Sequence, residues 1–304
     1  MRNLGWAAAG VAVVLLIAAP LGLNGYLVNL IYITMVYVGL AYGWNIISGY
    51  AGYFSFGQIT FFGLGAYATG FIINYLHWYW VAAALAGGII ALAFAFPLGY
   101  VMLRLRGPFF AMGMFGMAQT VRVLITAAPA TGAGAGLFLP PGSDITSVYY
   151  WTLAITLGAI ALTIWIDRSA FGLRLQALRE DEQVAGTLAV NVTRDKLSAF
   201  ALSALIPGLL GGGFIYFLTY IEPDAAFSSR LDLQSVVMTI LGGVGTVWGP
   251  LIGGVVMTQI AEALWAKFPQ LYLMIFGGLL VALLILMPRG ILPALQARMR
   301  VADE

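Results

Sequence analysis

Charged side chains are concentrated in one short stretch of this 304-residue chain. Residues 167–196 carry ten of its 26 formal charges, whereas residues 3–103 carry none. Four consecutive charged residues, Arg179, Glu180, Asp181 and Glu182, lie near the middle of the stretch. Such side chains form salt bridges and charge-assisted hydrogen bonds, so the stretch predicts a polar platform that a soluble partner can reach.

The same stretch has an apolar face. Apolar residues recur every three or four positions, at Leu175, Leu178, Val184, Ala185, Leu188 and Ala189. This spacing predicts a short amphipathic helix or a helix pair. The alternative is a solvated loop lying on lipid headgroups, but anionic lipid repels the three consecutive acids that begin at Glu180. The charge pattern therefore favours a protein partner.

Two glycine-rich segments interrupt the hydrophobic runs. Residues 48–58 include Gly52, Ser55, Gly57 and Gln58, and residues 242–250 include Gly243, Gly245, Thr246, Trp248, Gly249 and Pro250. Glycine and proline are poorly tolerated inside a continuous helix, and broken hydrophobic segments in both halves of a chain indicate a transport pathway. For any single glycine the alternative is close helix packing. Together, the two clusters predict a translocation path.

Several kinds of chemistry are missing from the sequence. It contains no H-E-x-x-H, G-x-S-x-G or phosphate-loop motif, no cysteine for a disulfide or Cys-based metal site, and no paired carboxylates on a membrane helix. The only ionisable residues expected inside spans are Arg122 and Glu262, both near span ends, whereas Asp232 is expected outside the membrane. No catalytic site or bound cofactor is predicted, and the net charge of +2 argues against a nucleic-acid partner.

The elements that must position these residues are membrane helices. Apolar residues make up 62% of the chain and charged residues 9%, which predicts one all-α integral membrane domain, residues 1–304, with about 8–10 transmembrane helices. The expected spans are 4–23, 26–47, 58–76, 81–103, 108–127, 148–166, 197–220 and 271–288. Region 236–265 is expected to form two half-helices that meet at a loop, or two short spans.

Orientation follows from arginine and lysine, which favour the cytoplasmic side. Placing Arg104, Arg106 and the 167–196 stretch inside puts both termini inside, and it puts the aromatic residues 77–80 at the outer interface. Arg2 followed by an apolar run also resembles a secretory signal, but the run is long enough to cross the membrane and favours an uncleaved first span.

Several motifs, in order along residues 40–255, resemble the LivM-type permeases of branched-chain amino acid ABC importers. They are residues 49–52 with 61–67, residues 103–108, residues 177–182 with 190–197, and residues 241–250. The resemblance implies a permease of the bacterial inner membrane that works with a second related permease subunit, two cytoplasmic P-loop ATPase subunits that bind the ATP, a periplasmic solute-binding protein and membrane lipid.

The resemblance also implies that residues 167–196 are a coupling loop seated in an ATPase groove. Arg179, Glu180, Asp181 and Glu182 would then supply charge contacts, and Val184, Ala185 and Leu188 the apolar seat. Asn191 would also belong to the ATPase-coupling residues. Gln58 stands where the family often has His, and Ala189 where Gly is common, so the solute stays open between hydrophobic amino acids and similar small organic solutes. The alternative functions are a stand-alone secondary carrier or facilitator and, less favoured, a membrane-embedded enzyme.

Overall fold

The computed structural model describes residues 2–140, 144–187 and 191–268, together with Leu271, Met274, Ile275, Gly277, Gly278, Val281 and Leu292. Its helices are α1 (Arg2–Gly22), α2 (Gly25–Trp44), α3 (Ile59–Leu76), α4 (Trp80–Met102), α5 (Pro108–Ala127), α6 (Ile145–Arg168), α7 (Ala170–Glu180), α8 (Glu182–Thr187), α9 (Val192–Leu218), α10 (Pro223–Ala226), α11 (Ser229–Gly242) and α12 (Gly249–Lys267). The shorter elements are a π-helix, η1 (Asn45–Tyr50), two 3₁₀ turns, η2 (Pro129–Thr131) and η3 (Ala133–Ala135), and an antiparallel pair of strands, β1 (Leu137–Phe138) and β2 (Tyr220–Ile221).

Six helical stretches within the described residues are long and apolar enough to cross a membrane. They are Gly25–Tyr50, Ile59–Leu76, Trp80–Met102, Pro108–Ala127, Ile145–Arg168 and Val192–Leu218. The prediction of an all-α membrane protein is therefore confirmed. The described apolar part of α1, Gly10–Gly22, is shorter than a span, and the predicted crossing 271–288 falls largely outside the described residues.

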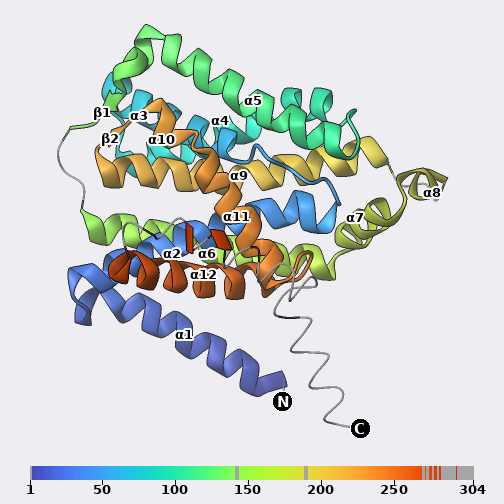
Figure 1. Cartoon of the computed structure of the whole chain (residues 1–304), viewed down its shortest axis with the longest axis horizontal. Helices are drawn as coiled ribbons and strands as arrows, with labels where there is room; N and C mark the ends of the chain where they lie inside the picture. Colours follow the sequence, from blue (N-terminus) through green and yellow to red (C-terminus); the bar gives the residue numbers. More distant parts are fainter. Residues whose placement is uncertain are drawn as a thin grey trace.

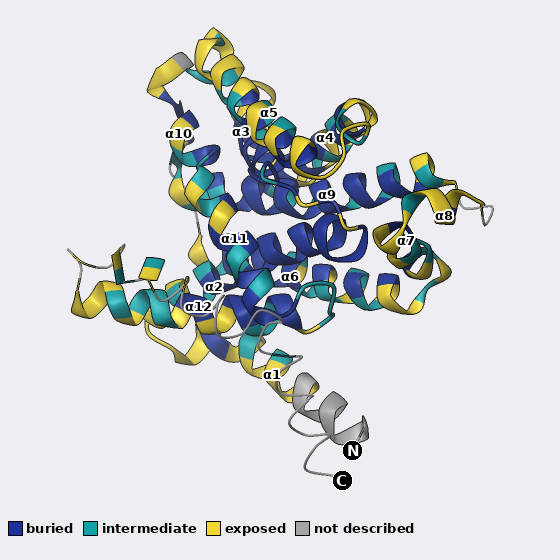
Figure 2. Ribbon diagram, turned by 45° about the vertical axis from the view of Figure 1, so that its right-hand side comes forward, coloured by how far each residue is buried: buried dark blue, intermediate teal, exposed yellow. Residues whose placement is uncertain are grey.

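Helix α9 forms the centre of the bundle. It crosses the middle of the molecule in Figure 1, with α3 and α4 packed on one side and α2 and α6 on the other. Small residues allow this close approach: a Cβ at Gly208 would lie 2.6 Å from Cβ of Ala91 in α4, and one at Gly211 would lie 2.1 Å from the Phe62 carbonyl in α3. Figure 2 shows α9 almost wholly buried, while α5 exposes one side.

Helix α11 begins inside the bundle. The amide of Gln119, within α5, donates to the hydroxyl of Ser229 in the first turn of α11 at 3.3 Å. Helix α11 then ends at Gly242, and α12 begins at Gly249 after a loop. The prediction that region 236–265 breaks at its glycines is confirmed, because residues 243–248 are not helical.

Helix α3 also begins inside the bundle. The α2 helix continues as η1 to Tyr50, and residues 51–58 are non-helical until α3 starts at Ile59. The side chain of Gln58 hydrogen-bonds Ser203, near the middle of α9, at 3.1 Å. The chain therefore contains two discontinuous helices whose N-terminal ends lie at depth, an arrangement found in transporter folds.

The charged stretch forms the expected helix pair, α7 and α8. Ser169 caps α7 through a hydrogen bond from the N–H of Gly172, and Asp181 caps α8 by accepting from the N–H groups of Gln183 and Val184. The apolar face of the pair packs on the chain's own bundle, since Leu175, Leu178 and Ala185 are at most 4% exposed.

Candidate functional site

The two broken segments meet at one end of the bundle, where Asn45 joins them. Its side-chain oxygen accepts from the N–H of Gly245 at 2.9 Å, and its amide nitrogen donates to the carbonyl of Thr246 at 3.0 Å. Tyr42 donates to the carbonyl of Val247 at 2.8 Å. Side chains from the end of α2 thus satisfy backbone groups of a loop that has no secondary structure of its own.

Arg179 links α7 to both broken segments. Its guanidinium donates to the carbonyl of Gly49 at 2.7 Å. Gly52 and Gly245 have φ angles of +78° and +72°, and a Cβ on either would lie less than 3.0 Å from the Arg179 side chain. Only glycine combines this left-handed backbone with such a close approach at low cost. Arg179 therefore places α7 in direct contact with both segments.

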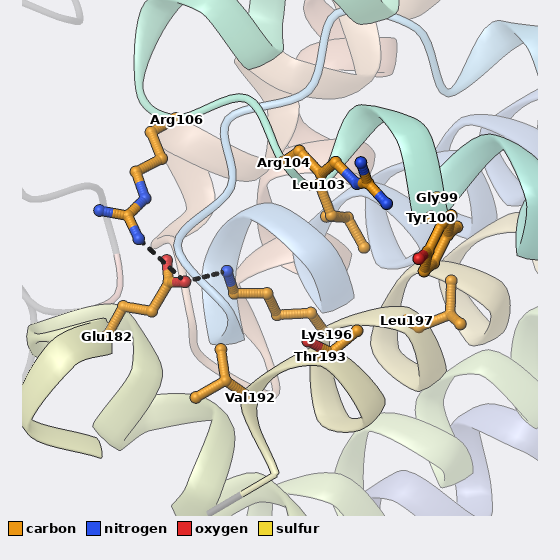
Figure 3. A pocket seen from close by; sticks show the side chains of 10 residues that line it. All are labelled: Gly99, Tyr100, Leu103, Arg104, Arg106, Glu182, Val192, Thr193, Lys196 and Leu197. Carbon is orange, nitrogen blue, oxygen red and sulfur yellow. Dashed lines mark ion pairs between the residues drawn. The ribbon is translucent and has the colours of Figure 1, made fainter. Parts of the chain in front are cut away.

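Glu182 links α8 to the start of α9 and to the α4–α5 connection. Its carboxylate lies 2.6 Å from Nζ of Lys196 and 3.6 Å from Arg106, and it accepts from the Tyr53 hydroxyl at 2.9 Å. Figure 3 shows Arg106 and Lys196 converging on Glu182 from opposite sides, at a cavity of about 360 Å³. Burial raises the pKa of Glu182, but the hydrogen bonds from Lys196 and Tyr53 outweigh it, so the pKa lies below its ordinary value.

A second ion pair holds α7 on α9. Arg174 donates to Asp195 through two nitrogens, at 2.8 and 3.2 Å, and the side chain of Asp195 is 8% exposed. This contact raises the pKa of Arg174. We call the set Arg174, Arg179, Glu182, Asp195 and Lys196 the α7–α8 joint.

The residues predicted to contact a partner have different environments. Glu180 and Val184 are exposed, Arg179 and Glu182 bond within the chain, and Asp181 caps α8. Ala185 is buried against the bundle, and Leu188 lies outside the described residues. Asn191 caps α9 by accepting from the N–H of Arg194. Their contact with a partner stays a prediction.

The residues predicted to line a path form two groups. Gly52, Gly243, Gly245, Thr246, Trp248, Gly249 and Pro250 lie in or beside the loops joined by Asn45 and Arg179, whereas Ser55, Gly57 and Gln58 are at greater depth. Thr246 accepts from the N–H of Gly249 at 3.0 Å and so helps to start α12. Ser55 and Gln58 are 0% and 2% exposed.

Asp232, expected in the acidic segment outside the membrane, is buried within the bundle. It is 5% exposed, in the first turn of α11, and it accepts from the backbone N–H of Ile59 at the start of α3 at 3.3 Å. The expectation followed from its neighbours Glu222 and Asp224, but the chain turns back into the bundle between Asp224 and Ser229. Arg122 does lie near a span end, where it pairs with Asp224 at 2.5 Å.

Sequence reasoning also missed Asn45 and Lys196. Asn45 is one of two side-chain amides in the apolar span 26–47, the other being Asn29, and a buried amide requires hydrogen-bond partners. Lys196 was counted as a charge of the loop, but its side chain is 5% exposed. The presence of an amide inside a span could have pointed to Asn45. No feature of the sequence pointed to the pairing of Lys196 with Glu182.

Taken together, several membrane-length helices and two discontinuous helices that meet inside the bundle define a multi-pass membrane protein of the transporter class. A family model described as the permease component of branched-chain amino acid transport systems matches residues 26–284. The chain belongs to this family.

Curated relatives agree with the family match. The chain is 26% identical to the high-affinity branched-chain amino acid transport permease LivM of Escherichia coli, with 95% of this chain and 75% of that protein covered. LivM of Salmonella typhimurium gives the same identity and coverage. The chain is 28% identical to LivH of Escherichia coli, with 84% of this chain and 91% of that protein covered. No solved structure matches the chain.

Proposed function

We propose that this chain is a translocation subunit of an ABC importer of the bacterial inner membrane, and that its solute is a branched-chain or similar hydrophobic amino acid. It acts with a second related permease subunit, two cytoplasmic P-loop ATPase subunits that bind the ATP, and a periplasmic binding protein. The family match and the transport functions of the LivM and LivH relatives support this assignment.

One observation carries the mechanism: Arg179 in α7 contacts both broken segments. An ATPase that moves α7 and α8 by a few ångströms shifts the Gly49 carbonyl and the loop at Gly245 together, because both rest on one guanidinium. Packed elements with two discrete arrangements convert such a shift into opening or closing of a path. The α7–α8 joint is thus the transmission element, and η1 at Gly49 and the loop at Gly245 form the gate.

The docking face of α7 and α8 must consist of side chains that the bundle does not use. Leu173 is 65% exposed and Val184 56%, and Glu180 lies exposed at the end of α7. Exposed apolar side chains and an exposed charge on the same helix pair suit a protein groove. Arg179 and Glu182 then hold the joint together, and Glu180 meets the ATPase.

Purification of the whole assembly from native membranes, through a tag on this chain, tests the proposal. The wild-type sample is expected to hydrolyse ATP in a vanadate-sensitive manner, and the double variant Glu180→Lys, Val184→Asp is expected to lose at least about 90% of that activity, because these changes place repulsion and an unpaired charge in the interface. Glu222→Lys, the same charge change near α10, is the matched control and should keep it. Gradient-driven leucine uptake by this chain alone in liposomes would instead establish a secondary carrier.

A further inference from the structure

Five buried polar residues lie on the segment that leads into α3 and on the parts of α9 and α11 that contact it. Ser55, Thr60 and Ser203 are 0% exposed, Gln58 is 2% exposed and Asp232 is 5% exposed. The cluster is deep in the bundle, because Ser203 lies near the middle of α9. Polar groups at this depth are costly, so they require either mutual hydrogen bonds or a ligand. We call these five residues the polar core cluster.

Asp232 is only partly satisfied by the protein. Its carboxylate accepts a hydrogen bond from the backbone N–H of Ile59 at 3.3 Å, a donor at the start of α3 that the helix itself leaves unpaired. A carboxylate has about four lone-pair sites, and this bond leaves others available. None of the ion pairs within the described residues includes Asp232. The carboxylate therefore keeps acceptor capacity and has no ion-pair partner in the part of the chain that the structure describes.

Gln58 adds an acceptor whose orientation is fixed. The Ser203 hydroxyl donates to the carbonyl of Phe200 at 2.7 Å, so toward Gln58 it offers only lone pairs. The amide nitrogen of Gln58 must therefore face Ser203, at 3.1 Å, and its oxygen faces elsewhere. Among the residues that the structure describes, that oxygen has no donor, and neither the Ser55 nor the Thr60 hydroxyl has a partner. Buried polar atoms without partners are rare and point to an unfilled role.

We propose that the polar core cluster binds the ammonium group of the transported amino acid, with Asp232 as its counter-ion and the Gln58 side-chain oxygen as a second acceptor. This inference rests on the proposed function and specifies where the solute is recognised. An ammonium group supplies one positive charge and three donors, which match a carboxylate and unpaired neutral oxygens. The competing explanation is that Asp232 serves only as a cap for α3.

Thermal unfolding of the purified full-length chain in detergent tests the site without ATPases. The probes are leucine, 3-methylbutylamine, which has the ammonium group but no carboxylate, and 4-methylpentanoate, which has the carboxylate but no ammonium group. Leucine and the amine are expected to raise the Tm in a saturable manner, because a ligand that binds only the folded state stabilises it. A rise with 4-methylpentanoate alone, or no rise with leucine and the amine, would overturn the proposal.

Asp232→Asn separates recognition from capping. Asparagine is as good a helix cap as aspartate, so the variant should fold with nearly the wild-type Tm while losing the counter-ion. We expect the leucine concentration for half-maximal stabilisation to rise about tenfold or more. Unchanged leucine and amine responses in this variant would show that Asp232 is a cap only.

Thr60→Val gives a second, independent readout. Replacing an unpaired buried hydroxyl with a methyl group should leave the Tm of the ligand-free chain equal or higher, while weakening the leucine response. Thr163→Val is the matched control, since Thr163 is equally buried in α6 and its hydroxyl bonds only the Ala159 carbonyl. An undiminished leucine response in Thr60→Val would remove Thr60 from the site.

Uptake by the complete assembly separates failure of this inference from failure of the proposed function. If wild-type assembly in proteoliposomes imports leucine with ATP and Asp232→Asn does so equally well, the site is wrong and the importer assignment stands. If the wild type shows no ATP-dependent uptake but the chain alone binds leucine through Asp232, the site stands and the importer assignment is wrong.

Discussion

Arg179 is the residue on which transmission between α7 and the gate depends. Removing its side chain in Arg179→Ala deletes a charge-assisted hydrogen bond to the Gly49 carbonyl, a contact of about 1.5–3 kcal/mol. We expect the assembly to keep hydrolysing ATP while leucine uptake per ATP falls about tenfold, since each 1.4 kcal/mol corresponds to a factor of ten. Gln176→Ala, an exposed change in the same helix, is the control. Equal loss of hydrolysis and uptake would place Arg179 in the ATPase interface instead.

Glu182 makes the stability of the joint depend on pH. Its pKa in the folded chain lies below the ordinary value of 4.5, so its contribution is fully present above pH 4.5 and is lost as the pH falls through the lowered pKa. The Tm difference between wild type and Glu182→Gln should therefore stay constant from pH 7 to about 5 and shrink only below that range. Thermal scans in detergent across this interval measure it. A difference that already disappears near pH 6 would contradict the lowered pKa.

At the scale of elements, the α11–α12 hairpin depends on contact between two backbones. A Cβ at Gly253 would lie 1.8 Å from the Met238 carbonyl, so Gly253→Ala must push α12 away from α11. We expect a loss of about 1–3 kcal/mol in unfolding free energy, the usual cost of overpacking. Gly158→Ala, in α6 with open space around it, should be neutral or stabilising because alanine favours helix. Chemical denaturation in detergent compares the two, and equal effects would contradict the close packing.

The elements were largely predictable because their signals are local. Apolar runs predicted the long helices, and the three- and four-residue spacing of apolar residues predicted the α7–α8 pair. The glycines at 242–249 predicted the break between α11 and α12. The π-helix at Asn45 had no local signal, and the Asn45 side chain finds its hydrogen-bond partner at Gly245, 200 residues away. The burial of Asp232 was not predictable for a related reason. It depends on the chain turning back into the bundle after α10, which composition does not reveal.

For the candidate sites, the sequence indicates which residues matter, but it does not indicate which way their side chains point. The charge run predicted a surface, and the structure shows that Arg179 and Glu182 point back to the bundle while Glu180 and Val184 do not. The glycine clusters were predicted to belong together, and Asn45 brings parts of them into contact. Pairwise contacts between distant segments decide these directions, and a single sequence does not contain them.

At the scale of the molecule, the proposed function requires α8 and the β1–β2 end of the bundle to lie on opposite sides of the membrane. Helix α9 runs from beside α8 to β2 through 27 residues, about 40 Å at 1.5 Å per residue, which is enough to cross the hydrocarbon core. Arginine and lysine near α8 favour its placement inside the cell.

Single cysteines test this orientation cleanly, because the natural chain has none. Thr187→Cys at the end of α8 and Glu222→Cys beside β2 both replace exposed side chains. In intact cells with a permeable outer membrane, a membrane-impermeant maleimide is expected to label Glu222→Cys and to label Thr187→Cys only after lysis. Asp144→Cys, an exposed position before α6, should behave like Glu222→Cys, since α6 also returns to the α7–α8 end. Labelling of Thr187→Cys in intact cells would place the joint outside, where no ATPase can reach it.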